Sequence, residues 1–186
     1  MPSLVVVTIQ SALLKVAANI TAQTLSQWGA ETTLGIDWAR VLEFALFGLI
    51  SAPLISFWQQ VLEETFPTQN GPIEPNPHAQ PLTQKPSQRY QTNWPNVIFK
   101  LVLDQTNGLC FTNIIFITCT TGARVQSIGL LFHEIETRIL GILKAGWKIW
   151  PVVAFVSFLW VPLQWRVIVT SLVGFGWNII LSFLSR

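Results

Sequence analysis

The sequence has little charge, because only 11% of its 186 residues are Asp, Glu, Lys or Arg. Soluble domains carry about 25%. Its formal net charge is +2 and its basic residues form no stripe, which excludes a typical nucleic-acid-binding surface. The two cysteines, Cys110 and Cys119, lie in one apolar stretch and indicate small hydrophobic residues rather than a disulfide or metal site. Lys15 is the first basic residue, so we expect no cleavable secretory signal.

Catalytic and metal-binding motifs are also missing. We find no Ser/His/Asp set, no Gly-rich phosphate loop and no metal-ligand cluster. His133-Glu134 lacks a second His at helical spacing, so it indicates a charged helix face rather than a metal site. We therefore expect no enzymatic activity, no cofactor and no metal.

Long apolar runs and tryptophan dominate what is present. Hydrophobic residues make up 51% of the chain, mean hydropathy is +0.48, and there are nine Trp, a residue that favours membrane interfaces. Between Ile149 and Ser185 the one charged residue is Arg166. At about 20 residues per crossing, this run is too long for one straight membrane helix. A charge there is costly, so we predict that Arg166 faces an acidic group or a wet cavity.

The first apolar segment, 4–28, carries its polar residues at steps of three or four, which places them on one helical face. These residues are Thr8, Ser11, Lys15, Asn19, Gln23 and Ser26. A polar stripe on a membrane helix should face the bundle interior or water. An amphipathic helix lying on the membrane surface remains the alternative.

A second span is predicted at 38–62, with Asp37 as its N-cap near Arg40. Pro53 should kink this helix. Small residues recur on one of its faces and should let another membrane helix approach closely. They are Ala45, Gly48, Ala52 and Ser56.

The segment 66–94 is rich in proline and polar residues and predicts a solvated loop. The third predicted span, 96–120, places Lys100 and Asp104 four residues apart on one face. Two charges in an apolar span are costly unless they are paired or wetted. At this spacing the two side chains can pair with each other, and a wet environment is the alternative.

The segment 124–148 alternates charged and apolar residues with helical period, and predicts an amphipathic helix at the membrane interface. Glu134 and Arg138 should form a surface pair on it. Pro162 divides the terminal run into a short lead-in and a last span at 163–184. Residues 1–186 thus predict one all-α membrane domain of four transmembrane helices, one amphipathic interfacial helix and a kinked, Pro-containing lead-in to the last span. Four spans would place both termini on the same side.

The order and spacing of several residues resemble the Mpv-seventeen and twenty-two-kilodalton peroxisomal membrane protein family, from about Ala18 to the C-terminus. The positions that carry the resemblance are Asp37, Pro53, Trp58, Gln105, Trp150, Pro151, Pro162 and Trp177. The sequence departs from the family's pattern elsewhere, with Asn19 in place of Asp and Gln59 in place of Tyr. The resemblance implies a small four-span protein of the mitochondrial inner membrane, the peroxisomal membrane or the vacuole. It also implies weakly selective channel activity for small solutes and no enzymatic activity.

Two functions follow from these residues. The first is a channel or pore for small solutes in an organelle membrane, with Asp104 as the main counter-ion of Lys100 or Arg166 and Glu43 as another candidate. Its polar interior would be formed by Lys15, Asn19, Gln23, Arg40, Lys100, Asp104 and Arg166. The alternative is a non-transporting structural or scaffolding membrane protein, in which the same charges form closed pairs that fix helix packing. In either case we expect the lipid bilayer as partner, with a homo-oligomer left open and no nucleic acid. The mitochondrial inner membrane is favoured over the peroxisomal membrane.

Overall fold

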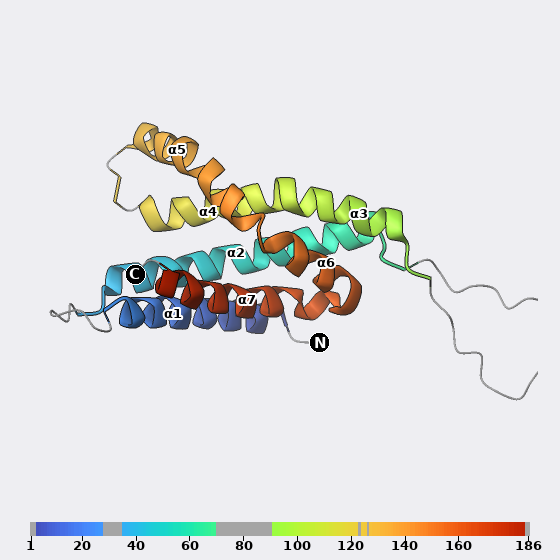
Figure 1. The fold of residues 1–186 in the computed structure, drawn as a ribbon, viewed down its shortest axis with the longest axis horizontal. Coiled ribbons are helices and arrows are strands. Elements are labelled where there is room, and N and C mark those ends of the chain that lie inside the picture. The colour runs from blue at the N-terminus through green and yellow to red at the C-terminus, as the bar shows by residue number, and fades with distance from the viewer. Residues whose placement is uncertain (1–2, 28–34, 70–90, 123, 126, 185–186) are drawn as a thin grey trace, which may run out of the picture.

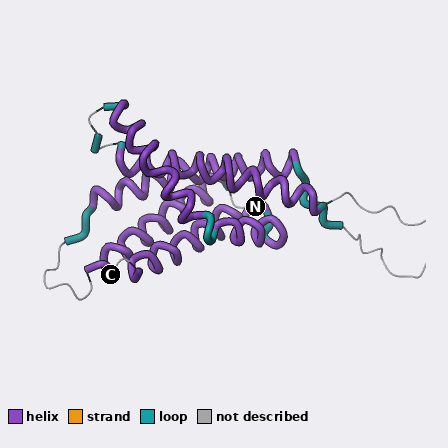
Figure 2. The backbone as a smooth tube through the Cα atoms, turned by 45° about the horizontal axis from the view of Figure 1, so that its top comes forward, coloured by secondary structure: helices purple, strands orange, loops and turns teal. Residues whose placement is uncertain are grey.

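The computed structural model describes residues 3–27, 35–69, 91–122, 124–125 and 127–184, and within these residues the chain is all-helical (Figures 1 and 2). Its elements are α1 (Leu4–Gln27), α2 (Trp38–Thr65), α3 (Trp94–Leu103), the π-helical turn η1 (Asp104–Gly108), α4 (Leu109–Thr121), α5 (Ile128–Gly146), α6 (Trp150–Trp160) and α7 (Leu163–Leu184). The predicted all-α class is confirmed for these residues. Trp28, at the end of the first predicted span, and positions 70–90 of the predicted loop lie outside them.

Local sequence signals account for several helix boundaries. Asp37 Oδ1 accepts a hydrogen bond from the backbone N–H of Arg40 at 3.1 Å, which is the predicted N-cap of α2. Pro151 lies in the first turn of α6, where a missing N–H does no harm. Pro162 separates α6 from α7, because the residue before a proline is driven out of the helical conformation. Pro53, in contrast, lies inside α2, which continues through it.

The third predicted span is occupied by α3, η1 and α4 in direct succession. The π turn begins at Asp104 and ends at Gly108, where Trp58 of α2 packs closely. A Cβ on Gly108 would lie 2.6 Å from the Trp58 indole nitrogen, so the close contact requires glycine. Single π turns inside helices are frequent at functional sites, which makes this segment a candidate.

Helices α1, α2 and α7 pack together, with α1 against both of the others (Figure 1). A Cβ on Gly48 would lie 2.5 Å from the Cα of Ala12, so the predicted face of small residues on α2 does let α1 approach closely. Helix α4 packs against another side of α2, and α5 packs against α4. The contacts among α1, α2 and α7 therefore form the most tightly packed part of the molecule.

Helices α1 and α7 run parallel. Ser11 contacts Ser171, and Val7 lies in one buried cluster with Val167, so the same difference in numbering holds at both places. The start of α1 and the end of α7 therefore lie at opposite ends of the bundle (Figure 1). The expectation that both termini share a side is wrong for this arrangement. The reason is the segment between α4 and α7, where α5 and α6 meet at a bend of 60° and carry the chain back along the bundle.

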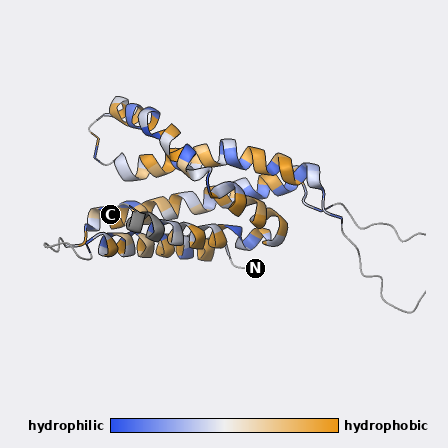
Figure 3. Cartoon of the chain, viewed as in Figure 1, coloured by the Kyte–Doolittle hydropathy of each residue, from blue (hydrophilic) through white to orange (hydrophobic). Residues whose placement is uncertain are grey.

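The distribution of polar and apolar side chains is that of a membrane protein. Among the described residues, eleven polar or charged residues are buried, as many as the buried hydrophobic ones, while large apolar side chains cover the outside. Figure 3 shows this apolar character along the length of the helices. Soluble proteins rarely expose apolar surface on this scale. By length and composition, α1 and α2 can each cross a membrane, and a third crossing is added if the bent pair α5–α6 counts as one span.

Candidate functional site

Two buried cations and one partly buried carboxylate, from three helices, meet near one end of the bundle. Glu63 Oε2, at the end of α2, lies 2.8 Å from Lys100 Nζ of α3 and 2.8 Å from Arg166 NH1 of α7. The Lys100 and Arg166 side chains are only 0% and 5% exposed, and that of Glu63 is 24% exposed. We call Glu63, Lys100 and Arg166 the charge cluster. Buried charges are tolerated only when they are paired and hydrogen-bonded, and this cluster satisfies that rule.

Neighbouring groups complete the charge cluster. The backbone N–H of Thr68 donates to Glu63 Oε1 at 2.8 Å, and the Thr68 hydroxyl accepts a hydrogen bond from Lys100. Arg166 Nε donates to the carbonyl of Val161 at 3.1 Å. The ring of Phe158 lies 5.2 Å from each cation, which suits cation–π attraction in a desolvated site. The cluster itself holds two cations and one carboxylate, so it carries an excess positive charge.

The prediction that Asp104 is the main counter-ion of Lys100 or Arg166 is wrong, because both cations pair with Glu63. Asp104 instead accepts hydrogen bonds from Trp58 Nε1 at 3.3 Å, Gln59 Nε2 at 3.0 Å and Gln105 Nε2 at 3.0 Å. It faces a part of α2 that lies before Glu63, where indole and amide N–H groups stabilise its charge. Lys100 is engaged across the helix interface by Glu63 instead.

Glu43, the other candidate counter-ion for Arg166, is also wrong in that role. Its Oε1 pairs with Arg124 Nε at 2.7 Å. This carboxylate raises the pKa of Arg124, through the hydrogen bond and the opposite charge. The prediction that Arg166 faces an acidic group is confirmed, but the group is Glu63, the third-last residue of α2.

The predicted polar stripe of α1 faces the bundle interior. The hydroxyls of Ser11 and Ser171 lie 2.9 Å apart, and Lys15 Nζ donates to Ser11 at 3.1 Å while it lies 5.0 Å from the Phe47 ring centroid. Further along the helix, Gln23 Nε2 donates to Asn19 Oδ1 at 2.7 Å. Because Ser11 is fully buried and α1 packs against two helices, α1 belongs to the bundle and does not lie apart on the membrane surface.

Several buried polar atoms have no hydrogen-bond partner among the described protein atoms. They are Ser51 Oγ, Gln59 Oε1, Gln105 Oε1, Ser157 Oγ and Arg166 NH1, the last of which has only its ion-pair contact with Glu63. Most buried polar groups in native proteins are bonded to protein or to ordered water. Gln59 and Gln105 both bind Asp104 through their amide nitrogens, so their free oxygens lie beside that carboxylate. The bundle interior therefore contains more polar atoms than the described side chains can pair in hydrogen bonds.

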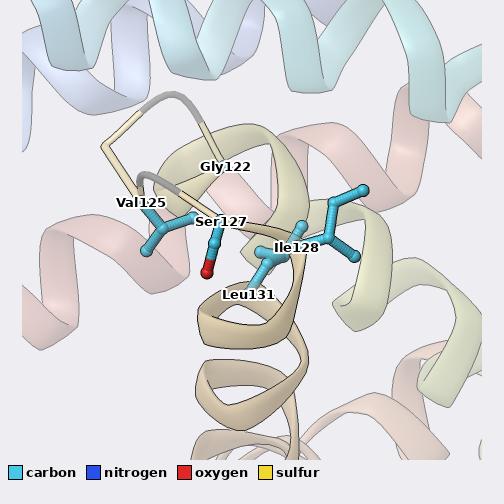
Figure 4. A pocket seen from close by; sticks show the side chains of 5 residues that line it. All are labelled: Gly122, Val125, Ser127, Ile128 and Leu131. Atoms are coloured by element: carbon cyan, nitrogen blue, oxygen red, sulfur yellow. The ribbon is translucent and has the colours of Figure 1, made fainter.

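Two pockets lie away from the charge cluster. One has a volume of about 430 Å³ and lies between α1, α2, α4 and α5, with Asn19 and Arg40 among its lining residues. The other, of about 200 Å³, lies at the start of α5, where Val125, Ile128 and Leu131 give it an apolar lining (Figure 4). The seven predicted interior residues thus do not share one cavity: Asn19 and Arg40 line the larger pocket, and Lys100 and Arg166 meet at Glu63.

The positions that carry the family resemblance hold the structure together around these sites. Trp58 donates to Asp104, and the carbonyl of Gln105 accepts a hydrogen bond from Trp147 Nε1 at 3.0 Å. Trp150 and Pro151 begin α6, Pro162 ends it, and Trp177 lies within α7. Sequence reasoning missed Glu63 and Thr68 as members of this site. The available signal for Glu63 was its position at the boundary between an apolar helix and a polar loop.

Comparisons with known proteins match most of the chain. PXMP2/4 family protein 3 of Dictyostelium discoideum is 31% identical over 150 residues, which cover 81% of this chain and 69% of that protein. The model of the Mpv17 / PMP22 family matches residues 124–182. The chain belongs to the Mpv17/PMP22 family. Mitochondrial inner membrane protein Mpv17 of Caenorhabditis elegans is 33% identical over 86 residues, 42% of this chain and 48% of that protein. Protein SYM1 of Saccharomyces cerevisiae is 23% identical over 150 residues, 80% of this chain and 67% of that protein.

No solved structure matches this Mpv17/PMP22 chain. The chain spans about half the length of the Caenorhabditis elegans relative. The segment matched by the Mpv17/PMP22 model contains Phe158 and Arg166, so part of the charge cluster lies within it. Family membership and the apolar helices together make the chain a membrane protein.

Proposed function

We propose that this protein is a weakly selective channel for small solutes in an organelle membrane. The observation that carries the proposal is the polar interior of the bundle. Among the described residues, buried polar side chains equal the buried hydrophobic ones in number, and several buried polar atoms have no hydrogen-bond partner. Inside a membrane, polar and charged side chains that face the bundle mark solute pathways. The channel activity implied by the family resemblance points the same way.

We propose an arrangement with five crossings of the bilayer. Four of them are made by α1, α2, the succession α3–η1–α4, and α7. The bent pair α5–α6 then makes a broken return crossing, which the parallel directions of α1 and α7 require. This replaces an interfacial position for the whole of α5. The exposed apolar side chains of these helices would contact lipid.

The proposed route starts at the larger pocket, which Asn19 and Arg40 line. It continues past the Ser11–Lys15–Ser171 contacts and the unpartnered hydroxyl of Ser51. It reaches Asp104 and ends at the charge cluster, where Lys100 and Arg166 are closed off by Glu63. The described conformation is closed there, so conduction would require the cluster to separate.

Planar-bilayer recording of the purified protein tests the channel. We expect conductance over a range of salts, and we expect Asp104→Ala to change its ion selectivity because a carboxylate on the route would be lost. Glu136→Ala, which removes an exposed carboxylate from α5, is the matched control and should leave the conductance unchanged. Silence of the wild-type protein across all salts, or identical conductance in Asp104→Ala, would count against the proposal.

One specific observation favours a second function, a non-transporting scaffold. Glu63 binds both buried cations at 2.8 Å, a closed arrangement that can fix helix register without conducting anything. The scaffold would give silent bilayers from protein that is folded and correctly inserted. Neither function includes a catalytic step.

We further propose the mitochondrial inner membrane as the location, as the printed name of the Caenorhabditis elegans relative states for that protein. Imaging of the tagged protein against mitochondrial and peroxisomal markers tests this. Coincidence with the peroxisomal marker alone would overturn it.

A further inference from the structure

The larger pocket concentrates arginine from three separate elements. Arg40 comes from the first turn of α2, Arg124 from the turn between α4 and α5, and Arg138 from α5. Their side chains are 57%, 46% and 47% exposed, so each guanidinium can be reached from outside. Glu43 is the acidic residue among those that line the pocket. The lining therefore carries two positive charges more than negative ones.

The three guanidiniums keep unused donors. A guanidinium has five N–H groups, and Arg124 uses Nε for Glu43, which leaves its terminal nitrogens without a hydrogen bond to any described residue. Arg138 NH1 donates to the hydroxyl of Thr121 at 3.2 Å. Arginine forks match the oxygens of phosphate groups and bind them in pairs of parallel hydrogen bonds. The free donors of this pocket thus suit an anion with several oxygens.

The acidic neighbours do not cancel these charges. Arg40 Nε lies 3.3 Å from Asp37, and Arg138 NH1 lies 3.6 Å from Glu134, but both pairs are on the surface. Exposed ion pairs contribute little free energy, so an incoming anion can replace them. The buried Glu43 has a different role, because its short contact with Arg124 holds a turn residue at the pocket. We regard Glu43 as a positioning residue.

The pocket lies where phosphate groups occur next to a membrane. It is at the end of the bundle where α4 ends and α2 begins (Figure 1), and the ends of crossing helices lie at the headgroup level of a bilayer. Phe44 and Phe116 also line it, with their ring centroids 5.8 Å apart. A volume of about 430 Å³ is in the range of small-ligand sites.

We propose that this pocket is a binding site for a phosphate group, held by Arg40, Arg124 and Arg138. The phosphate belongs either to a phospholipid headgroup or to a soluble phosphate compound. The aromatic side of the pocket takes the apolar part of the same molecule. The site does not depend on the channel, since an anion can bind here whether or not the bundle conducts.

The test uses the full-length protein in neutral detergent with two probes, inorganic phosphate and short-chain phosphatidate, and calorimetry as the readout. Short-chain phosphatidylcholine serves as a zwitterionic lipid control. Arg138→Gln and Arg40→Gln should each weaken binding by about tenfold, the loss expected when charge-assisted hydrogen bonds are removed. Lys144→Gln, an exposed cation on α5 that does not line the pocket, is the matched control and should have less than twofold effect. Higher salt should weaken binding further.

The outcomes distinguish a phospholipid headgroup from a soluble phosphate compound as the source of the phosphate, and both from the absence of binding. Binding of both probes, lost in Arg138→Gln, supports a site for soluble phosphate compounds as well as lipids. Binding of phosphatidate alone, lost in the same variant, assigns the site to a phospholipid headgroup. No binding of either probe to folded protein, or equal affinity in Arg138→Gln and Lys144→Gln, overturns the proposal. Bilayer conductance is measured separately, so a silent channel with intact phosphate binding would refute only the channel.

Discussion

Glu63 is the single carboxylate that neutralises two buried cations, so its replacement by Gln should destabilise the protein strongly. Lys100 is 0% exposed and the Arg166 side chain 5% exposed, and both lie 2.8 Å from the same oxygen of Glu63. Removing one partner of a buried ion pair costs about 3–5 kcal/mol, because a desolvated charge is left without compensation. Glu63 is 24% exposed, so some solvent reaches the site, and we expect a loss near about 3 kcal/mol.

The assay is reversible unfolding in mixed micelles, followed by circular dichroism. Glu64→Gln is the matched control, since Glu64 is the adjacent residue, is exposed, and accepts a hydrogen bond only from the exposed Gln60 among the described residues. It should unfold like the wild type. Adding Lys100→Met to Glu63→Gln removes one of the two stranded cations, so the double variant should regain part of the lost stability. Equal stability of Glu63→Gln and Glu64→Gln would refute the role given to the charge cluster.

Two further predictions concern close helix contacts. Gly48→Ala should lower the free energy of unfolding by about 1–3 kcal/mol, because its Cβ would lie 2.5 Å from the Cα of Ala12 and α1 would have to move. Gly141→Ala on α5, where nothing lies within 4 Å, is its control and should cause no loss in the same unfolding assay. Gly108→Ala should displace the Trp58 indole and so weaken its hydrogen bond to Asp104. A shift in the Trp absorption edge and a lower free energy of unfolding would reveal this. An unchanged spectrum and unchanged stability would contradict it.

Local features of the structure could be predicted from the sequence because they depend on nearby residues. Asp37 caps α2, and Pro162 separates the last two helices, as expected. The polar stripe of α1 faces inward because its spacing matches one turn of a helix, and Ser11 is accordingly fully buried. The Glu134–Arg138 pair on α5 forms at 3.6 Å, as its spacing indicated.

The remaining features depend on contacts between helices, which spacing along one helix does not determine. Lys100 and Asp104 have the right separation for a pair, yet Glu63 of another helix lies closer to Lys100. The π turn that begins at Asp104 has no sequence signal of its own. The direction of α7 depends on the 60° bend between α5 and α6. The sequence therefore allowed four apolar segments to be recognised, but not the end of the bundle at which each segment terminates.

The central claim is that the polar interior of the bundle is a solute pathway. Single-channel recording of Ser51→Cys, with Cys110 and Cys119 changed to Ser, tests it most directly, because the Ser51 hydroxyl is buried and has no partner among the described atoms. If the interior conducts, a water-soluble methanethiosulfonate reagent should reach this cysteine and reduce the current, while the same protein with Ser51 intact should be unaffected. Current that is identical before and after the reagent, from protein shown by mass to be unmodified, would contradict a pathway at Ser51.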